Sequence, residues 1–98
     1  GRLLAVWNPL PELPAIERAP GARYNSARSP LMVATSTDEG KTWTNGFLLE
    51  NGENGGGYCY TAIHFYREYA YFAYCAGDNR DHHSLTRLRI TRVLLSEI

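Results

Sequence analysis

Three observations in the sequence predict an all-β fold. Residues 36–43 read Ser-Thr-Asp-Glu-Gly-Lys-Thr-Trp, a turn motif of the form S-x-D-x-G-x-T-W. Short apolar or alternating runs recur along the 98 residues and are separated by polar or glycine-rich segments, as in strands joined by loops. All five prolines fall between residues 9 and 30, and this density excludes a regular helix or a central strand there.

We expect the strands at residues 3–7, 31–35, 47–50, 58–66, 70–76 and 85–95. The long proline-rich loop 8–30 follows the first strand, and the glycine- and asparagine-rich loop 51–57 follows the third. In the last strand, alternation places Leu88, Ile90 and Leu94 on one face and Arg87, Arg89 and Thr91 on the other, while Arg92 interrupts the apolar face. No helix is required, although residues 12–19 could form one helical turn.

The turn motif has a structural explanation for each of its specified residues, Ser36, Asp38, Gly40, Thr42 and Trp43. The Asp38 carboxylate can accept hydrogen bonds from backbone N–H groups within the turn. Gly40 can adopt a positive φ without steric cost. Trp43 offers a large apolar surface that can wedge between strands. The motif therefore predicts a fold and not a catalytic activity.

Composition excludes several classes of function. The ten basic and ten acidic residues give a net charge of zero, which argues against a nucleic-acid-binding protein. No apolar run approaches the ~20 residues that a membrane-spanning helix needs, so we expect no membrane partner. The chain begins at Gly1 without a methionine, and the sequence assigns no cellular compartment. Seven tyrosines and two tryptophans favour strands and supply the ring surfaces that sugar-binding sites use.

The turn motif is called an Asp box, and it resembles the turn between the third and fourth strands of a β-propeller blade. The resemblance implies antiparallel four-stranded blade units in a single partial domain over residues 1–98. Residues 3–50, with the Asp box at 36–43, would supply the last three strands of one blade, and residues 58–95 the first three strands of the next. That makes about one and a half blades, whereas closed propellers have roughly four to eight. The chain is therefore expected to form only part of a ring.

Two further segments extend this resemblance to a family. Arg28 lies in Asn-Ser-Ala-Arg-Ser-Pro-Leu (25–31), and Tyr60 lies in Gly-Tyr-Cys-Tyr-Thr-Ala-Ile (57–63). With the Asp box, in this order and spacing, they resemble the C-terminal part of a sialidase, or of the bacterial sialidase-like proteins with BNR repeats. At the nucleophile the family usually has Tyr-Ser-x-Leu, and here Tyr-Thr-Ala-Ile stands in its place.

The resemblance implies a six-bladed propeller that hydrolyses terminal sialic acid or a related sugar, with no cofactor and no metal. Three arginines of such a domain clamp the substrate carboxylate, a tyrosine assisted by a glutamate is the nucleophile, and an aspartate is the acid/base. Arg28 matches the third clamp arginine and Tyr60 the nucleophile, while Tyr24 and Asn25 are expected to line the same rim. The other catalytic residues would lie upstream of Gly1, so the isolated chain is expected to be inactive.

The chemistry explains these residue types. Sialic acid carries a carboxylate on its anomeric carbon, so an attacking carboxylate would meet like-charge repulsion and a neutral phenol would not. A tyrosine with a pKa near ~10 needs an adjacent base to become a nucleophile. An arginine fork can hold a carboxylate through two parallel hydrogen bonds. In a blade, strands one and three run in the same direction, so Arg28 and Tyr60 should share one rim and the Asp box should lie on the opposite rim.

Three alternatives remain open in the sequence. Cys59 and Cys75 should lie nearly opposite each other across a hairpin, either as two buried thiols or as a disulfide. Asp78, Asp81, His82 and His83 are potential metal ligands, but they read as a hairpin loop, and we predict no metal site. The chain could instead be a non-catalytic β-sheet module that binds carbohydrate or protein and forms homo-oligomers through its unpaired edge strands.

Overall fold

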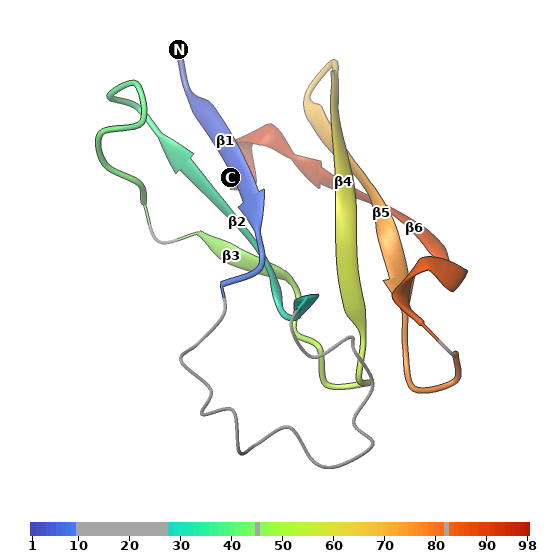
Figure 1. Cartoon of the computed structure of the whole chain (residues 1–98). Coiled ribbons are helices and arrows are strands. Elements are labelled where there is room, and N and C mark those ends of the chain that lie inside the picture. The colour runs from blue at the N-terminus through green and yellow to red at the C-terminus, as the bar shows by residue number, and fades with distance from the viewer. Residues whose placement is uncertain (10–27, 45, 82) are drawn as a thin grey trace.

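A computed structural model describes residues 1–9, 28–44, 46–81 and 83–98. These residues form two three-stranded antiparallel sheets and contain no α-helix (Figure 1). The first sheet comprises β1 (Leu3–Trp7), β2 (Leu31–Ser36) and β3 (Phe47–Glu50). The second comprises β4 (Gly57–Tyr66), β5 (Tyr69–Gly77) and β6 (Leu88–Leu94). Two 3₁₀ turns, η3 (Ser84–Thr86) and η4 (Leu95–Glu97), flank β6. The predicted all-β class is confirmed.

The hydrophobic core lies between the two sheets, and the alternation of β5 produces one side of it. Every second residue of β5 is buried, among them Phe72 and Tyr74, which are at most 1% exposed. They join Tyr58 of β4 in one cluster with Leu31 and Val33 of β2. Burying one such side chain stabilises the fold by about 2–3 kcal/mol. The central strand of each sheet is therefore held by packing against the other sheet.

The last strand is shorter than predicted. β6 begins at Leu88 and not at residue 85, because residues 84–86 form the turn η3. The Nδ1 atom of His83 accepts a hydrogen bond from the backbone N–H of Leu85 and caps this turn. Around Leu85, a local capping interaction thus takes the place of the strand pairing that the sequence predicted.

The apolar face of β6 is the outer one. Leu88 is 71% exposed and Ile90 is 63% exposed, whereas Arg89 and Thr91 are half-buried. Glu50 of β3 and Tyr74 of β5 provide partners for these two inward residues. Glu50 accepts hydrogen bonds from the Tyr74 hydroxyl, at 2.8 Å, and from the Arg89 guanidinium. The Tyr74 and Thr91 hydroxyls are 2.7 Å apart.

The first sheet also has an apolar outer face. Leu3 and Trp7 of β1 and Leu48 of β3 are 47%, 40% and 47% exposed. Their strand neighbours Leu4, Val6, Phe47 and Leu49 pack instead against the core. Each sheet therefore carries apolar side chains on both faces, a pattern typical of sheets that are covered on both sides. Among the described residues, no helix has both the length and the apolar character to cross a lipid bilayer.

Candidate functional site

Arg28 and Tyr60 lie together at one end of the two sheets. Arg28 lies just before β2 of the first sheet, and Tyr60 belongs to β4 of the second. The Cζ atom of Arg28 lies 5.2 Å from the centroid of the Tyr60 ring. In Figure 1 the segment before β2 and the start of β4 are at the same end of the molecule. The guanidinium thus stacks on the aromatic ring in the manner of a cation–π pair.

The backbone of β4 turns Tyr60 out of the sheet. The pairing of β4 with β5 is interrupted by a bulge between Cys59 and Ala62, and Tyr60 has a left-handed φ of 56°. Its side chain is 70% exposed, whereas that of Tyr58, two residues earlier, is 1% exposed. A left-handed conformation is costly for a bulky residue, and bulges commonly re-aim a side chain at functional sites.

Asn8 connects the two segments that carry the pair. Its Nδ2 atom donates to the backbone oxygen of Pro30, at 2.8 Å, and to that of Tyr58, at 3.2 Å. Pro30 follows Arg28 by two residues and Tyr58 precedes Tyr60 by two. One side-chain amide thus joins the segment before β2 to the start of β4. This role of Asn8 has no signal in the sequence, because an asparagine between a strand and a proline is ordinary loop composition.

Tyr60 and Cys59 are the neighbours that most affect the pKa of the Arg28 guanidinium. Hydrogen bonding to Tyr60, and then to Cys59, raises the pKa of Arg28 above its usual value. Arg28 is half-buried and remains a permanent cation. A guanidinium carries five N–H donors, so donors remain after these contacts for a bidentate grip on a carboxylate. The arrangement can therefore bind an acidic group beside an aromatic ring.

Cys59 and Cys75 are directly opposite each other across β4 and β5. Both are free thiols, Cys59 buried and Cys75 half-buried. Burial, and then the neighbouring Cys59, raises the pKa of the Cys75 thiol. The Cys59 sulfur is 3.9 Å from the Ser84 hydroxyl of η3. Cys59 immediately precedes the exposed Tyr60 in β4.

The Asp box forms a closed hydrogen-bonded turn at the opposite end of the first sheet (Figure 1). Asp38 accepts hydrogen bonds from the backbone N–H of Thr42 at 2.8 Å, from its hydroxyl at 2.5 Å and from the Ser36 hydroxyl at 2.8 Å. These bonds from Thr42 and Ser36 lower the pKa of Asp38 to about 2. Gly40 has a φ of 87°, the positive value expected of it.

Trp43 differs from its expected position between strands. It is 44% exposed, and its indole Nε1 donates to the backbone oxygen of Gly40 at 3.1 Å. A Cβ added at Gly40 would lie 3.7 Å from the Trp43 ring and 3.8 Å from Leu3. The indole therefore covers the turn instead of entering the core.

The acidic loop after β5 is held by arginines. Asp78 and Asp81 are buried, and they pair with Arg80 at 2.6 Å and with Arg87 at 2.7 Å. These contacts hold the pKa of each carboxyl below its usual range. Within the described residues there is no group of three or more side chains arranged to hold a metal ion. The predicted rim residues Tyr24 and Asn25, and His82 of this loop, lie outside the described residues.

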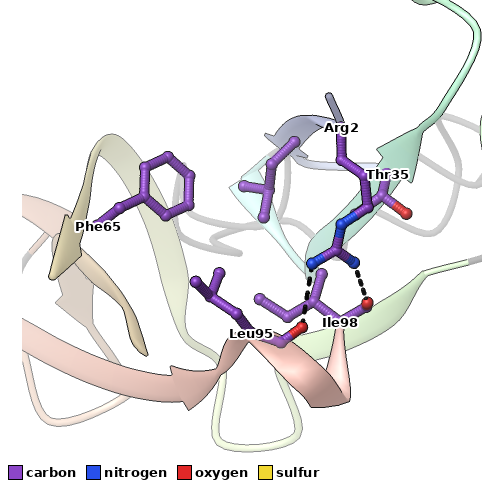
Figure 2. A pocket seen from close by; sticks show the side chains of 6 residues that line it. Arg2, Thr35, Phe65, Leu95 and Ile98 are labelled. Atoms are coloured by element: carbon purple, nitrogen blue, oxygen red, sulfur yellow. Dashed lines mark hydrogen bonds between the residues drawn. The ribbon is translucent and has the colours of Figure 1, made fainter. Parts of the chain in front are cut away.

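A pocket of about 280 Å³ lies at the end where β1 begins and β4 ends, away from Arg28 and Tyr60. Figure 2 shows the Arg2 guanidinium above the apolar side chains that line it. Arg2 donates to the backbone oxygen of Ile98 at 2.6 Å and to that of Leu95 at 3.2 Å. Phe65 closes the opposite wall. Arg2 thus holds η4 against β1.

Comparisons of this chain with protein-family models, with curated proteins and with solved structures found no match.

Proposed function

We propose that this chain binds the carboxylate of an acidic sugar through Arg28, with Tyr60 beside the bound ring. The observation that carries the proposal is the pairing of the two side chains, 5.2 Å apart, at an exposed end of the molecule. Tyr60 is 70% exposed and its backbone has a left-handed conformation, so its side chain contributes little to packing. A costly conformation of this kind favours a role in binding. The paired charge and ring surface match a sugar that carries an acid.

The larger assignment, to a sialidase-like glycoside hydrolase, is part of the same proposal. The two three-stranded sheets would be adjacent blades of a partial propeller, with sialic acid or a related sugar as the ligand and Tyr60 as the nucleophile. A phenol needs a base to attack a sugar. In the described part of the chain, the contact at this site is the one between Arg28 and Tyr60. These residues would bind the substrate. Hydrolysis is proposed only for a domain that also brings the catalytic carboxylates to the same site.

The test is a titration followed by ¹⁵N chemical shifts, with sialic acid and, separately, with its methyl ester. The acid should shift the resonances of residues 28 and 58–61, and the ester should shift them far less, because it lacks the charge that Arg28 holds. Arg28→Ala should weaken binding about tenfold or more, as expected for a lost hydrogen bond to a charged group.

Two matched variants separate charge from geometry. Arg28→Lys keeps the cation and removes the fork, so binding should weaken while some preference for the acid remains. Tyr60→Phe keeps the ring and removes the hydroxyl, so it should weaken binding less than Arg28→Ala does. Equal binding of acid and ester, or unchanged binding in Arg28→Ala, would contradict the proposal.

A second candidate function is self-association through the second sheet. Leu88 and Ile90 on edge strand β6 are 71% and 63% exposed, which is costly in water for two neighbouring apolar side chains. An edge strand also has unpaired backbone groups that another strand can bind. Light scattering over a range of concentrations tests this candidate, and a constant mass of one chain would exclude it.

A further inference from the structure

Cys59 and Cys75 are placed where two thiols can react with each other. They are directly opposed on neighbouring strands, β4 and β5, and both are reduced in this structure. Opposed residues of an antiparallel pair have Cα atoms about 4.5 or 5.5 Å apart, depending on the kind of pair. Disulfides join residues with Cα separations of about 4.4–6.8 Å. Either kind of pair therefore allows a disulfide without displacing a strand.

The two thiols differ in accessibility, which sets an order of reaction. Cys75 is half-buried and Cys59 is buried, so a soluble disulfide reaches Cys75 first. Cys59 is also the residue directly opposite Cys75 on the neighbouring strand. Cys59 is thus the resolving thiol, positioned to attack a sulfur attached to Cys75.

The pair is adjacent to Tyr60. Cys59 directly precedes Tyr60 in β4, where the bulge between Cys59 and Ala62 begins. A disulfide between Cys59 and Cys75 would therefore join β4 to β5 at the edge of this bulge.

We propose that Cys59 and Cys75 form a reversible redox pair, oxidised by glutathione disulfide. The Cys75 thiolate attacks one sulfur of glutathione disulfide, forming a mixed disulfide and releasing one glutathione thiolate. The Cys59 thiolate then attacks the Cys75 sulfur and releases the second glutathione. The protein loses two protons and two electrons, and one glutathione disulfide becomes two glutathione thiols. This proposal does not depend on sugar binding.

The first experiment equilibrates the chain in buffers of increasing ratio of oxidised to reduced glutathione, blocks free thiols with iodoacetamide, and measures intact mass. We expect a monomeric species that carries two blocking groups in reducing buffer and none, with the loss of two hydrogens, in oxidising buffer. Peptide mapping should join Cys59 to Cys75. Two blocking groups at every ratio, or a disulfide only between chains, would overturn the proposal.

Single serine variants test the order of reaction. Cys59→Ser leaves the accessible thiol without its resolving partner, so it should accumulate a stable glutathione adduct at Cys75. Cys75→Ser leaves only the buried thiol and should react several-fold more slowly. Faster reaction of Cys75→Ser than of Cys59→Ser would overturn the assigned order.

Discussion

Tyr60 holds a left-handed backbone, with a φ of 56°, and its side chain is 70% exposed. A left-handed conformation costs a non-glycine residue about 1–2 kcal/mol, and here little burial offsets it. Glycine adopts the same conformation freely. We therefore expect Tyr60→Gly to leave the free energy of unfolding unchanged or to raise it. Tyr60→Val should lower the free energy of unfolding by about 1 kcal/mol or more, because a β-branched side chain tolerates the left-handed conformation least. Urea denaturation measures both.

Tyr66 is the control for this prediction. It lies on the same strand, β4, is 53% exposed and does not have a positive φ. Tyr66→Gly should lower the free energy of unfolding by about 0.5–1 kcal/mol, the usual cost of glycine within a strand. If Tyr60→Gly were as destabilising as Tyr66→Gly, the left-handed backbone at Tyr60 would not be a source of strain.

Asp38 makes the stability of the Asp box dependent on pH. Its pKa is lowered to about 2 by hydrogen bonds from Thr42 and Ser36, while the unfolded value is about 4. A carboxyl group with a depressed folded pKa contributes stability above its unfolded pKa, and this contribution is lost as the pH falls from about 4 to about 2. Asp38→Asn should lower the thermal midpoint by several degrees at pH 7, and its difference from the wild type should shrink toward pH 2.

Glu39→Gln is the control for Asp38→Asn, because it removes the adjacent, exposed carboxylate from the same turn. Its thermal midpoint should follow that of the wild type across the pH range. Asp78 and Asp81 also have lowered pKa values, so the wild type as a whole loses stability in acid. The informative quantity is therefore the difference between wild type and variant. A difference that is the same at pH 7 and pH 2 would contradict the role given to the Asp38 charge.

At the scale of elements, local sequence signals were sufficient for most strand positions. β1 and β3 have the predicted bounds, because Asn8 and Pro9 end the first and a glycine stands on either side of the second, at 46 and 52. The Asp box is equally local, since its hydrogen bonds join residues at most four apart. Such features can be predicted from sequence because every partner lies within the same segment.

Features that depend on distant partners were not predictable in the same way. Alternation in β6 separates two faces but does not say which face is inward. Arg89 and Thr91 lie inward because Arg89 hydrogen-bonds to Glu50 and Thr91 hydrogen-bonds with Tyr74. Glu50 is 39 residues away from Arg89 in the sequence. Asn8 acts over 50 residues, on Tyr58. That Arg28 and Tyr60 lie close together was expected only from a family resemblance in their spacing. The bulge that exposes Tyr60 has no signal in the sequence.

The contact between Glu50 and Arg89 is a charged link between the two sheets. The Glu50 side chain is 14% exposed and that of Arg89 is 38% exposed, so solvent screens the pair only in part. Glu50→Ala removes the partner of both Arg89 and Tyr74. It should lower the free energy of unfolding by about 2 kcal/mol, less than the loss for a fully buried pair. Denaturant titration measures this value.

Thr91→Val is the matched control for the inter-sheet link. It removes one neutral hydroxyl partner of Tyr74 while Glu50 remains, so it should cost about 1 kcal/mol. Equal losses for Thr91→Val and Glu50→Ala would mean that the charged contact adds nothing to the neutral one.

For the whole molecule, the notable property is that both outer faces are apolar. Leu3, Trp7 and Leu48 lie exposed on one sheet, and Leu88 and Ile90 on the other. Contact between the same face of two copies would give a closed dimer, whereas contact between the two different faces would be head-to-tail and would close into rings or extend as filaments. Burial of apolar side chains of this size favours association in water. The mass in solution should therefore increase with protein concentration.

The variant Leu88→Lys/Ile90→Lys places two charges on the outer face of β6, and it should shift the molecule to a single-chain mass at every concentration measured by light scattering. The folded core should persist, because both side chains are already more than 60% exposed. Leu85→Lys is the control: this leucine is 50% exposed but lies on η3, outside the sheet, so association should continue. A wild-type chain that keeps a single-chain mass at every concentration would show that the exposed apolar faces do not drive association. If Leu85→Lys lost association equally, the loss would be due to the added charge and not to the outer face of β6.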